Sequence, residues 1–345
     1  MQVLIQQLEA LQPLTTRQIA EASAFLVDPN PTAETKAMFL KALNQKGETP
    51  DEIAGFVTEF LKLAVDPGID RKALTGPMLD VVGTGGDKLN LFNVSTTAMF
   101  IMAAGGVCMV KHGNRGITSK SGGADVLEAL GVRIDLPPEK LARCVQEVGV
   151  GFVFAPIYHP AFAAVKDARA LLAKEGKRSI FNILGPLMNP ARPDFQLIGV
   201  FDKALTSPFA TILQKLGRKA AWVVHGTTED GRGMDELSTL GVNEVTTLQG
   251  GTIESLKLDP ATLGFAKARI DDLAGGEAAV NADLLEGILA GRIKGPKRDI
   301  AVLNAAAGFV ITGKATDLLE GKHLAEEVLD RGAAHVKLRA LQDFC

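Results

Sequence analysis

Residues 78–131 read MLDVVGTGGDKLNLFNVSTTAMFIMAAGGVCMVKHGNRGITSKSGGADVLEALG. This stretch predicts a strand, a loop and a helix, in that order, twice in succession. In the first unit, the apolar residues 78–82 predict a β-strand that enters the glycine-rich loop 83–87. Hydroxyl side chains at 95–97 can cap a helix that ends near the glycines 105–106. Such a loop exposes backbone N–H groups to an anion, although glycines after a strand are equally typical of a tight turn.

The second unit follows directly. Residues 107–110 predict a strand, residues 111–115 its loop, and residues 121–130 a helix. This loop region adds cationic side chains, namely Lys111, His112, Arg115 and Lys120. If the two strands are parallel, both loops leave the same carboxyl edge of the sheet, where open α/β sheets hold their ligands. The pair of loops therefore predicts a site for a ligand with several anionic groups, such as a phosphate ester.

Two common nucleotide sites are excluded by spacing. The sequence lacks the G-x-x-x-x-G-K-[ST] pattern, and Gly83 and Gly85 are not followed by the third glycine of the dinucleotide fingerprint. Asp87 would repel a bare phosphate, so we expect it to meet sugar hydroxyls, a metal-bound water or neighbouring N–H groups, or only to cap the loop. ATP and NAD are accordingly disfavoured as ligands.

Composition describes an ordinary globular protein. The 345 residues are 46% hydrophobic and 22% charged, which predicts about two domains, and the net charge is −3. This balance offers no broad basic face for nucleic acid or an anionic membrane. Cys108, Cys144 and Cys345 are scattered along the chain and odd in number, which favours neither a disulfide framework nor a cysteine metal site. We expect a cytoplasmic protein that is neither exported nor membrane-spanning.

The first 65 residues predict helices only. Thr16 can cap one helix, and residues 49–52 form a capping box with proline at the first helical position. The helix that follows carries an apolar stripe at positions 53, 56, 57, 60, 61 and 64. That stripe must be buried against the protein itself or a partner subunit. Residues 66–68 and 76–77, rich in Gly and Pro, predict a domain junction.

Arg169 occupies an unusual position. After a predicted strand at 150–155 and a loop at 156–160, a helix from about residue 161 places Arg169 on the same stripe as Phe162 and Leu172. A guanidinium cannot be buried there unpaired, so it must meet either a protein carboxylate or the anion of a ligand. An internal ion pair is the commoner case in proteins, and both alternatives remain open at this point.

The last third adds a pair of acids. Strands are predicted at 195–201 and 220–225, with a helix at 205–216 between them. The polar loop after the second strand ends in Asp235 and Glu236, which suit Mg²⁺ but could equally be solvated loop acids. Beyond this loop we expect alternating strands and helices, with Asn281 capping one helix and residues 295–296 opening the next.

The motifs in these stretches closely resemble those of the anthranilate phosphoribosyltransferase family. The central matches are DVVGTGGD at 80–87, FNVST at 92–96, KHGNR at 111–115 and SKSG at 119–122. Further matches follow in order, at residues 154–160, 181–190, 224–226, 235–238 and 304–306. The resemblance implies transfer of a phosphoribosyl group from phosphoribosyl pyrophosphate to the amine of anthranilate, with release of pyrophosphate, in tryptophan biosynthesis.

The same resemblance implies site residues. Those for phosphoribosyl pyrophosphate are Gly83, Gly86, Asp87, Asn93, Val94, Ser95, Thr96, Lys111, His112, Gly113, Asn114, Arg115, Gly116, Ser119 and Gly123. Gly83, Asn114 and Arg169 would bind anthranilate, with Arg169 on its carboxylate. Ser95, Asp235 and Glu236 would hold Mg²⁺, two ions per subunit. No catalytic base is assigned, because a neutral aromatic amine already has its lone pair; His112 could act as one or only position the ligand.

The implied fold is an α/β protein with a small helical N-terminal domain and a larger domain around a central, mostly parallel sheet, as in nucleoside phosphorylases and phosphoribosyltransferases. We expect a helical domain at 1–70, joined by helices within 161–190, an α/β domain at 76–345, and a homodimer formed through the helical domain.

Three departures from the family pattern stand out: residues 88–91 replace a shorter, glycine-containing link, Gly123 replaces a frequent serine, and the loop before Asp235 is longer. Two alternatives remain. A pyrimidine nucleoside phosphorylase would leave Arg169 and the acid pair without a role, and a non-enzymatic nucleic-acid-binding relative should have a basic groove and broken loop motifs.

Overall fold

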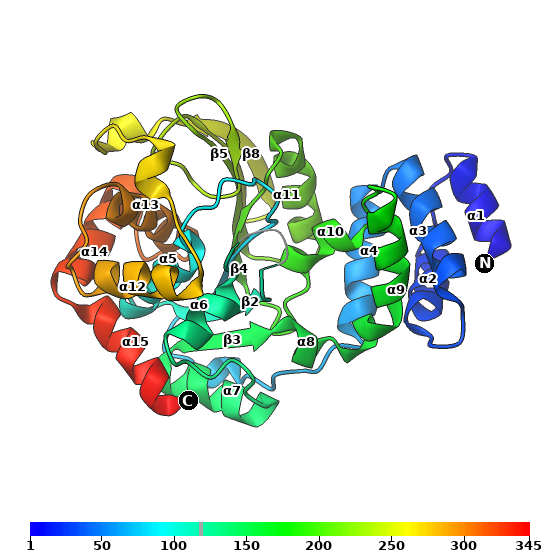
Figure 1. Cartoon of the computed structure of the whole chain (residues 1–345), viewed down its shortest axis with the longest axis horizontal. Coiled ribbons are helices and arrows are strands. Elements are labelled where there is room, and N and C mark those ends of the chain that lie inside the picture. Colours follow the sequence, from blue (N-terminus) through cyan, green and yellow to red (C-terminus); the bar gives the residue numbers. More distant parts are fainter. Residues whose placement is uncertain (117–119) are drawn as a thin grey trace.

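The computed structural model describes residues 1–116 and 120–345 and divides into two lobes (Figure 1). The smaller lobe is helical. It contains α1 (Gln2–Glu9), α2 (Thr16–Val27), α3 (Ala33–Lys46), α4 (Pro50–Leu61), α9 (Lys166–Lys174) and α10 (Phe181–Leu184). We call this set the helical lobe. The larger lobe is an α/β structure.

The strands of the larger lobe are β1 (Met78–Gly83), β2 (Cys108–Gly113), β3 (Val150–Phe154), β4 (Phe195–Gly199), β5 (Ala220–Thr227), β6 (Gly233–Met234), β7 (Asn243–Gln249) and β8 (Thr252–Leu258). Its α-helices are α5 (Val94–Ala104), α6 (Gly123–Ala129), α7 (Pro138–Val148), α8 (Ala155–Tyr158), α11 (Thr206–Lys215), α12 (Ala278–Leu289), α13 (Pro296–Ile311), α14 (Leu318–Asp330) and α15 (Ala333–Phe344). Short 3₁₀ turns are η1 (Arg71–Ala73), η2 (Pro160–Val165), η3 (Gly185–Leu187), η4 (Lys203–Leu205), η5 (Pro260–Leu263) and η6 (Ile270–Leu273).

The sheet is mostly parallel, as predicted. Its order is β3-β2-β1-β4-β5-β7-β8, in which the first five strands are parallel, while β7 and β8 are antiparallel and β6 pairs antiparallel with β5. The expectation that strands and helices alternate to the end of the chain is wrong. After the β7–β8 hairpin the chain forms only helices, because α12–α15 are needed to cover one face of the sheet (Figure 1).

Side-chain alternation divides the sheet between two cores. On β5, Trp222 and Val224 join the core under α5 and α12–α15, whereas Ala221 and Val223 face α11. The core on the α11 side is continuous with the interior of the helical lobe, so the two lobes share buried apolar contacts. No helix among the described residues is long and apolar enough to cross a membrane.

The chain enters the helical lobe twice. The predicted stripe is buried at positions 53, 56, 57, 60 and 61 of α4, whereas position 64 lies beyond the end of the helix and is partly buried. Phe60 packs against rings from the returning segment, 5.3 Å from Phe162 and 5.6 Å from Phe181 between centroids. The buried Lys36 of α3 reaches the same segment, where its Nζ donates to the carbonyl of Ala164 at 2.8 Å. The lobe is therefore built from segments that are about one hundred residues apart in sequence.

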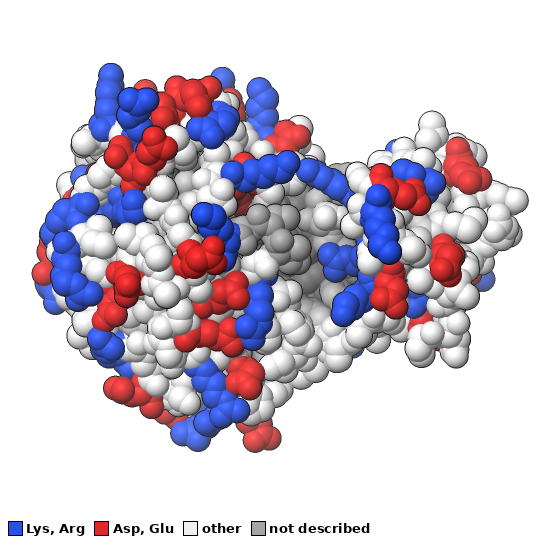
Figure 2. Space-filling view, in the orientation of Figure 1, with Lys and Arg blue, Asp and Glu red and all other residues white. Residues whose placement is uncertain are grey.

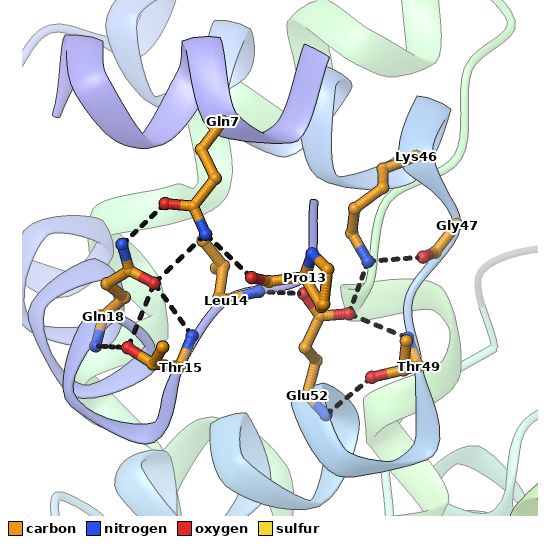
Figure 3. A network of polar contacts seen from close by, with 9 residues as sticks. All are labelled: Gln7, Pro13, Leu14, Thr15, Gln18, Lys46, Gly47, Thr49 and Glu52. Carbon is orange, nitrogen blue, oxygen red and sulfur yellow. Dashed lines mark hydrogen bonds and ion pairs between the residues drawn. The ribbon is translucent and has the colours of Figure 1, made fainter. Parts of the chain in front are cut away.

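A buried polar network fixes the start of α4 (Figure 3). The capping box predicted at 49–52 is present, and the carboxylate of Glu52 also accepts the backbone N–H of Leu14 at 2.9 Å. Lys46 Nζ lies 2.6 Å from Glu52 Oε2, with side chains that are 4% and 1% exposed. On the other side of the α1–α2 loop, the side-chain amides of Gln7 and Gln18 hydrogen-bond to each other (Figure 3). One carboxylate thus links the α1–α2 loop, α3 and α4.

Several local expectations need correction. Residues 111–113, predicted as loop, continue strand β2 because they pair in register with β3. Helix α5 begins at Val94 without a side-chain cap, so Ser95, Thr96 and Thr97 lie inside its first turn. Helix α2 is capped by Thr15, one residue before the predicted cap.

Asn281 also differs from its predicted role. It lies within the first turn of α12, where its Oδ1 accepts the N–H of Gly276 and its Nδ2 donates to Asn93 Oδ1.

A candidate active site at the strand ends

Both predicted loops open into one pocket of about 350 Å³ at the carboxyl ends of β1 and β2. The predicted residues that line it are Gly83, Gly86, Asp87, Asn93, Val94, Ser95, Thr96, Lys111, His112, Gly113, Asn114, Arg115, Gly116, Gly123, Asp235 and Glu236. Ser119 lies outside the described residues. Figure 2 shows the surface hollowed between the two lobes, with Lys and Arg side chains along its border. Arg169 belongs to the helical lobe and does not line the pocket.

The glycine-rich loop is held against the acid pair. Gly85 and Gly86 have φ of 69° and 93°, values that favour glycine, and Gly85 N–H donates to Asp235 Oδ2 at 2.7 Å. Thr84 fixes the loop to β4, since its N–H donates to Gly199 O at 2.9 Å and its Oγ1 accepts Phe201 N–H at 3.1 Å. The loop is therefore positioned before any ligand binds.

Three strands have a glycine at or next to their last residue where the acid pair crosses them. A β-carbon at Gly83 or Gly199 would collide with Asp235, and one at Gly226 would collide with the carbonyl of Glu236. The close approach of backbones therefore requires glycine at the ends of β1, β4 and β5. The end of the predicted polar loop, at 233–236, is thus packed against the strand ends, while residues 229–232 are exposed.

The acid pair is partly buried in the pocket wall. Burial is the main cause that raises the pKa of Asp235 well above its usual range, and the nearby carboxylates of Asp87 and Glu236 add to it. Burial likewise raises the pKa of Glu236 to about 7, although Lys111 and the backbone N–H of Ser95 oppose the shift. Glu236 Oε1 accepts that N–H at 3.2 Å. Buried carboxylates that repel one another form a site that a cation would stabilise.

Lys111 is a buried cation on β2 whose side chain reaches the start of α5. Its Nζ donates to Val81 O at 2.5 Å and to Ser95 Oγ at 3.1 Å. Burial lowers the pKa of Lys111, while the carboxylates of Asp80, Glu236 and Asp235 raise it. Asp80 is fully buried beneath it, and burial raises the pKa of that carboxyl to about 6. The ammonium is thus poised at the start of α5, facing the pocket.

His112 is neutral near pH 7 because burial, followed by the neighbouring His159, lowers its pKa to about 3. Its Nδ1 lies 3.1 Å from Gly185 O, and a carbonyl can only accept, so Nδ1 carries the proton. Its Nε2 is then an acceptor, and it is buried without a partner within the described structure. An unpartnered acceptor at the pocket wall is suited to a ligand N–H group.

The second loop is held by α6 and α12. Asp125 Oδ2 accepts the N–H groups of both Gly116 and Gly122 at 2.8 Å. Arg115, predicted as a ligand cation, forms an ion pair with Glu128, with Nη2 2.9 Å from Oε1. Its guanidinium must leave Glu128 to reach a ligand.

The side chain of Asn93 is occupied in a similar way. Its Nδ2 donates to Ser121 O at 3.1 Å and its Oδ1 accepts from Asn281 Nδ2 at 2.9 Å. Asn93 therefore braces the loop against α12 in this conformation.

A row of rings leads from the pocket to Arg169. The centroid of His112 is 5.2 Å from that of His159, which stacks on Phe162 at 5.2 Å. Phe162 lies 5.3 Å from Phe181, and the Arg169 guanidinium lies over Phe181 at 5.4 Å. Burial lowers the pKa of Arg169, and no described carboxylate pairs with its guanidinium. Of the two partners left open by the sequence, the protein carboxylate is absent from the described part of the chain.

The chemistry of the acid pair fits Mg²⁺ shared with a ligand. Among the described residues no group of three or more His, Cys, Asp or Glu side chains forms a closed metal cage. Mg²⁺ commonly uses one or two carboxylates and takes its other ligands from water and substrate phosphates. Asp235 and Glu236 meet this requirement, because they are partly buried, mutually repelling and open to the pocket.

Sequence reasoning missed residues that support the site without belonging to a loop motif. Asp80, Asp125 and Asn281 hold Lys111, the second loop and Asn93, and nothing in their local pattern distinguishes them from core or capping residues. Thr84 could have been found, because its hydroxyl lies in the first loop.

This fold and this site define a glycosyltransferase of two domains. The glycosyl transferase helical bundle family matches residues 2–64, and the a/b domain family matches residues 75–335. Anthranilate phosphoribosyltransferase from Rhodopseudomonas palustris (strain TIE-1) is 44% identical over 95% of this chain and 93% of its own length. The enzyme from Moorella thermoacetica is 41% identical over 98% and 96%.

Solved structures give the same result. Anthranilate phosphoribosyltransferase from Thermus thermophilus superposes with a TM-score of 0.89 at 39% identity, over 99% of this chain and 98% of that one. The Saccharomyces cerevisiae enzyme in complex with PRPP and Mg gives 0.83 at 26% identity, over 96% and 93%. The chain belongs to the anthranilate phosphoribosyltransferase family.

Proposed function

We propose that the protein transfers the phosphoribosyl group of phosphoribosyl pyrophosphate to the amine of anthranilate, releasing pyrophosphate, in tryptophan biosynthesis. The observation that carries the proposal is the meeting of three features in one pocket: the loop 83–87, the buried Lys111 and the acid pair Asp235–Glu236. Together they match an anionic ligand that brings its own phosphates to a divalent cation. The relatives with this name support the assignment.

The reaction requires stabilisation of charge rather than a strong nucleophile. As the glycosidic bond to pyrophosphate breaks, negative charge grows on the leaving group and positive charge on the ribosyl carbon. Lys111, the loop N–H groups and the N-terminus of α5 face the leaving group and stabilise it electrostatically. Bound Mg²⁺ supplies further charge neutralisation to the pyrophosphate.

Two Mg²⁺ ions per subunit would suit Asp235 and Glu236, because the two carboxylates point in different directions. Asp235 is directed to the N–H of Gly85, at the first loop, whereas Glu236 is directed to the N–H of Ser95, at the start of α5. The two carboxylates therefore face different parts of the pocket, with Ser95 Oγ beside the second. We propose one ion at each carboxylate, with Ser95 completing the set at α5.

Anthranilate would bind between the pocket and the helical lobe. The guanidinium of Arg169, which pairs with no carboxylate of the described residues, is a partner for the anthranilate carboxylate. The ring row formed by His112, His159, Phe162 and Phe181 offers aromatic surface between Arg169 and the pocket. Gly83 and Asn114 line the pocket on the other side. The neutral His112 Nε2 can accept a hydrogen bond from the amine, which orients the lone pair without requiring a strong base.

One assay tests the activity. The protein with anthranilate, phosphoribosyl pyrophosphate and Mg²⁺ should release pyrophosphate and consume anthranilate fluorescence, and EDTA should stop the reaction. A parallel assay of thymidine and uridine phosphorolysis tests the nucleoside phosphorylase alternative. Phosphorolysis without phosphoribosyl transfer would overturn the proposal.

We further propose that the helical lobe corresponds to residues 1–70 with the returning helices in 161–190, that residues 76–345 form the α/β domain, and that two copies associate through the helical lobe in the cytoplasm. Val3, Leu11 and Met38 support the dimer, because these apolar side chains on the lobe are 72%, 67% and 52% exposed in the single chain. Sedimentation velocity should give the mass of two chains, and Met38→Glu should shift it toward one.

A further inference from the structure

Two of the three cysteines, distant in sequence, lie together on the α/β domain. Cys144 lies on the buried face of α7, and Cys345, partly exposed, follows α15, whose end lies beside α7 (Figure 1). The two thiols lie close enough to interact, and each shifts the pKa of the other. The residues next to them are also in contact, since the Arg143 guanidinium lies 6.0 Å from the Phe344 ring centroid. Both thiols are free, as the sequence predicted.

The surroundings give the two thiols different reactivity. The neighbouring Cys144 thiol, the backbone N–H of Arg133 and the charges of Lys140 and Arg133 outweigh burial and lower the pKa of Cys345 to about 7. A partly exposed thiol with this much thiolate at neutral pH is a nucleophile. Cys144 is fully buried, its Sγ lies 3.1 Å from Val150 O, and the adjacent Cys345 thiol raises its pKa. It stays protonated until its neighbour reacts.

We propose that Cys345 and Cys144 are a reversible redox pair, in which Cys345 attacks a small-molecule disulfide and Cys144 then closes an intramolecular disulfide between α7 and the end of α15. Disulfides in reducing compartments are usually transient and either catalytic or redox-sensing, and the proposed bridge is of this kind. The site is separate from the pocket at the strand ends, so the inference does not depend on the proposed function.

The chemistry balances with the disulfide as the oxidant. The Cys345 thiolate attacks one sulfur of the reagent, forms a mixed disulfide and releases one reagent thiolate. Cys144 then loses its proton to solvent and attacks Cys345 Sγ, which forms the protein disulfide and releases the second reagent thiolate. The two protein thiols are oxidised by two electrons, and one reagent disulfide is reduced to two thiols.

Oxidised glutathione is a suitable probe, with free thiols counted after denaturation and peptides mapped without reduction. The full chain should lose two of its three thiols and yield a peptide linking Cys144 to Cys345. Cys144→Ala should instead accumulate glutathione on Cys345, because the resolving thiol is missing. Cys108→Ala is the matched control, since it removes the third cysteine, which is also buried, and it should behave as the parent chain.

Cys345→Ser changes a partly exposed position and should abolish the reaction, which keeps the test decisive if Cys144→Ala folds poorly. Three free thiols in the oxidised parent chain would overturn the proposal. So would glutathione that persists on Cys345 in the parent chain as it does in Cys144→Ala, or a bridge that includes Cys108.

Discussion

At the scale of single residues, the pocket is a set of charges held in place without their ligand. Asp235 and Glu236 are partly buried beside each other, and Lys111, the Ser95 side chain and backbone N–H groups oppose their repulsion. A carboxylate whose pKa is raised by folding costs stability once the pH exceeds its unfolded pKa. The acid pair therefore weakens the free protein at neutral and higher pH, and this cost is removed when a cation binds.

The double change Asp235→Asn and Glu236→Gln should separate these roles. We expect turnover to fall at least about a hundredfold, because charge that would hold Mg²⁺ against the pyrophosphate is lost. The free variant should melt no lower than the parent at pH 8, since the repulsion is removed. Mg²⁺ with pyrophosphate should raise the melting temperature of the parent only. Retained Mg²⁺-dependent turnover would show that the acids are structural.

Arg169→Ala tests the partner of the unpaired guanidinium. The loss of a charge-assisted contact to a carboxylate costs roughly 2–3 kcal/mol, so the KM for anthranilate should rise about thirty- to a hundredfold. The melting temperature and the affinity for phosphoribosyl pyrophosphate should stay nearly unchanged, because no described carboxylate is left unpaired. Lys166→Ala, an exposed change on the same helix, is the control. A lower melting temperature with unchanged KM would contradict the substrate role.

Among the elements, the helical lobe depends on one carboxylate. Burial alone would raise the pKa of Glu52, but hydrogen bonds from Leu14, Lys46 and Thr49 lower it overall. An acid with a lowered pKa contributes stability above its unfolded pKa and loses it as the pH falls through the folded value. The network in Figure 3 is thus fully effective at neutral pH and fails in acid.

Glu52→Gln keeps the shape of the side chain and leaves Lys46 buried without its counter-ion. We expect a loss of roughly 3–5 kcal/mol in the free energy of unfolding. Glu59→Gln on the same helix is the matched control: its partner Lys62 is 59% exposed, and the loss should stay below about 1 kcal/mol. Urea denaturation followed by circular dichroism measures both. Equal losses in the two variants would show that the network in Figure 3 contributes no more to the free energy of unfolding than an exposed ion pair.

The sequence predicted elements well where the pattern was local. The stripe on α4, the capping box at 49–52 and the strand β1 before its glycine loop all follow from short-range rules, and the structure contains them. Residues 111–113 were misassigned because the strand extends through pairing with β3, which local polarity does not reveal. The burial of Asp235 and Glu236 depends on glycines of β1, β4 and β5, and only the fold brings these together.

For the molecule as a whole, stability depends on pH through histidines and carboxylates whose pKa values are shifted by burial. Burial lowers the pKa of His112 to about 3 and that of His159 to about 4, so the unfolded chain binds more protons than the folded one below pH 6.5. These histidines therefore cost stability as the pH falls below 6.5. Asp80 and Glu236 act in the opposite direction, because their pKa values are raised to about 6 and 7.

His159→Phe isolates one of these opposing contributions, since a phenyl ring can keep the stacking on Phe162 without titrating. Between pH 7 and pH 5 the free energy of unfolding of the parent should fall by about 2 kcal/mol relative to that of the variant. The reason is that His159 takes up a proton in the unfolded chain and stays neutral in the folded one. Urea denaturation at both values measures the difference. His323→Gln, a change at an exposed histidine, is the matched control. A parallel pH dependence in parent and His159→Phe would rule out the buried histidine as the cause.

The double entry of the chain into the helical lobe has a consequence for synthesis. Helices α1–α4 leave the ribosome about one hundred residues before α9 and α10, so the stripe on α4 has only part of its packing, against α2, when it first emerges. Phe60 then waits for Phe162 and Phe181, which arrive only after the first three strands have been made. During that interval the nascent chain presents an apolar face to the chaperones at the exit tunnel, and the amino-terminal helices become a finished lobe only after much of the other lobe exists.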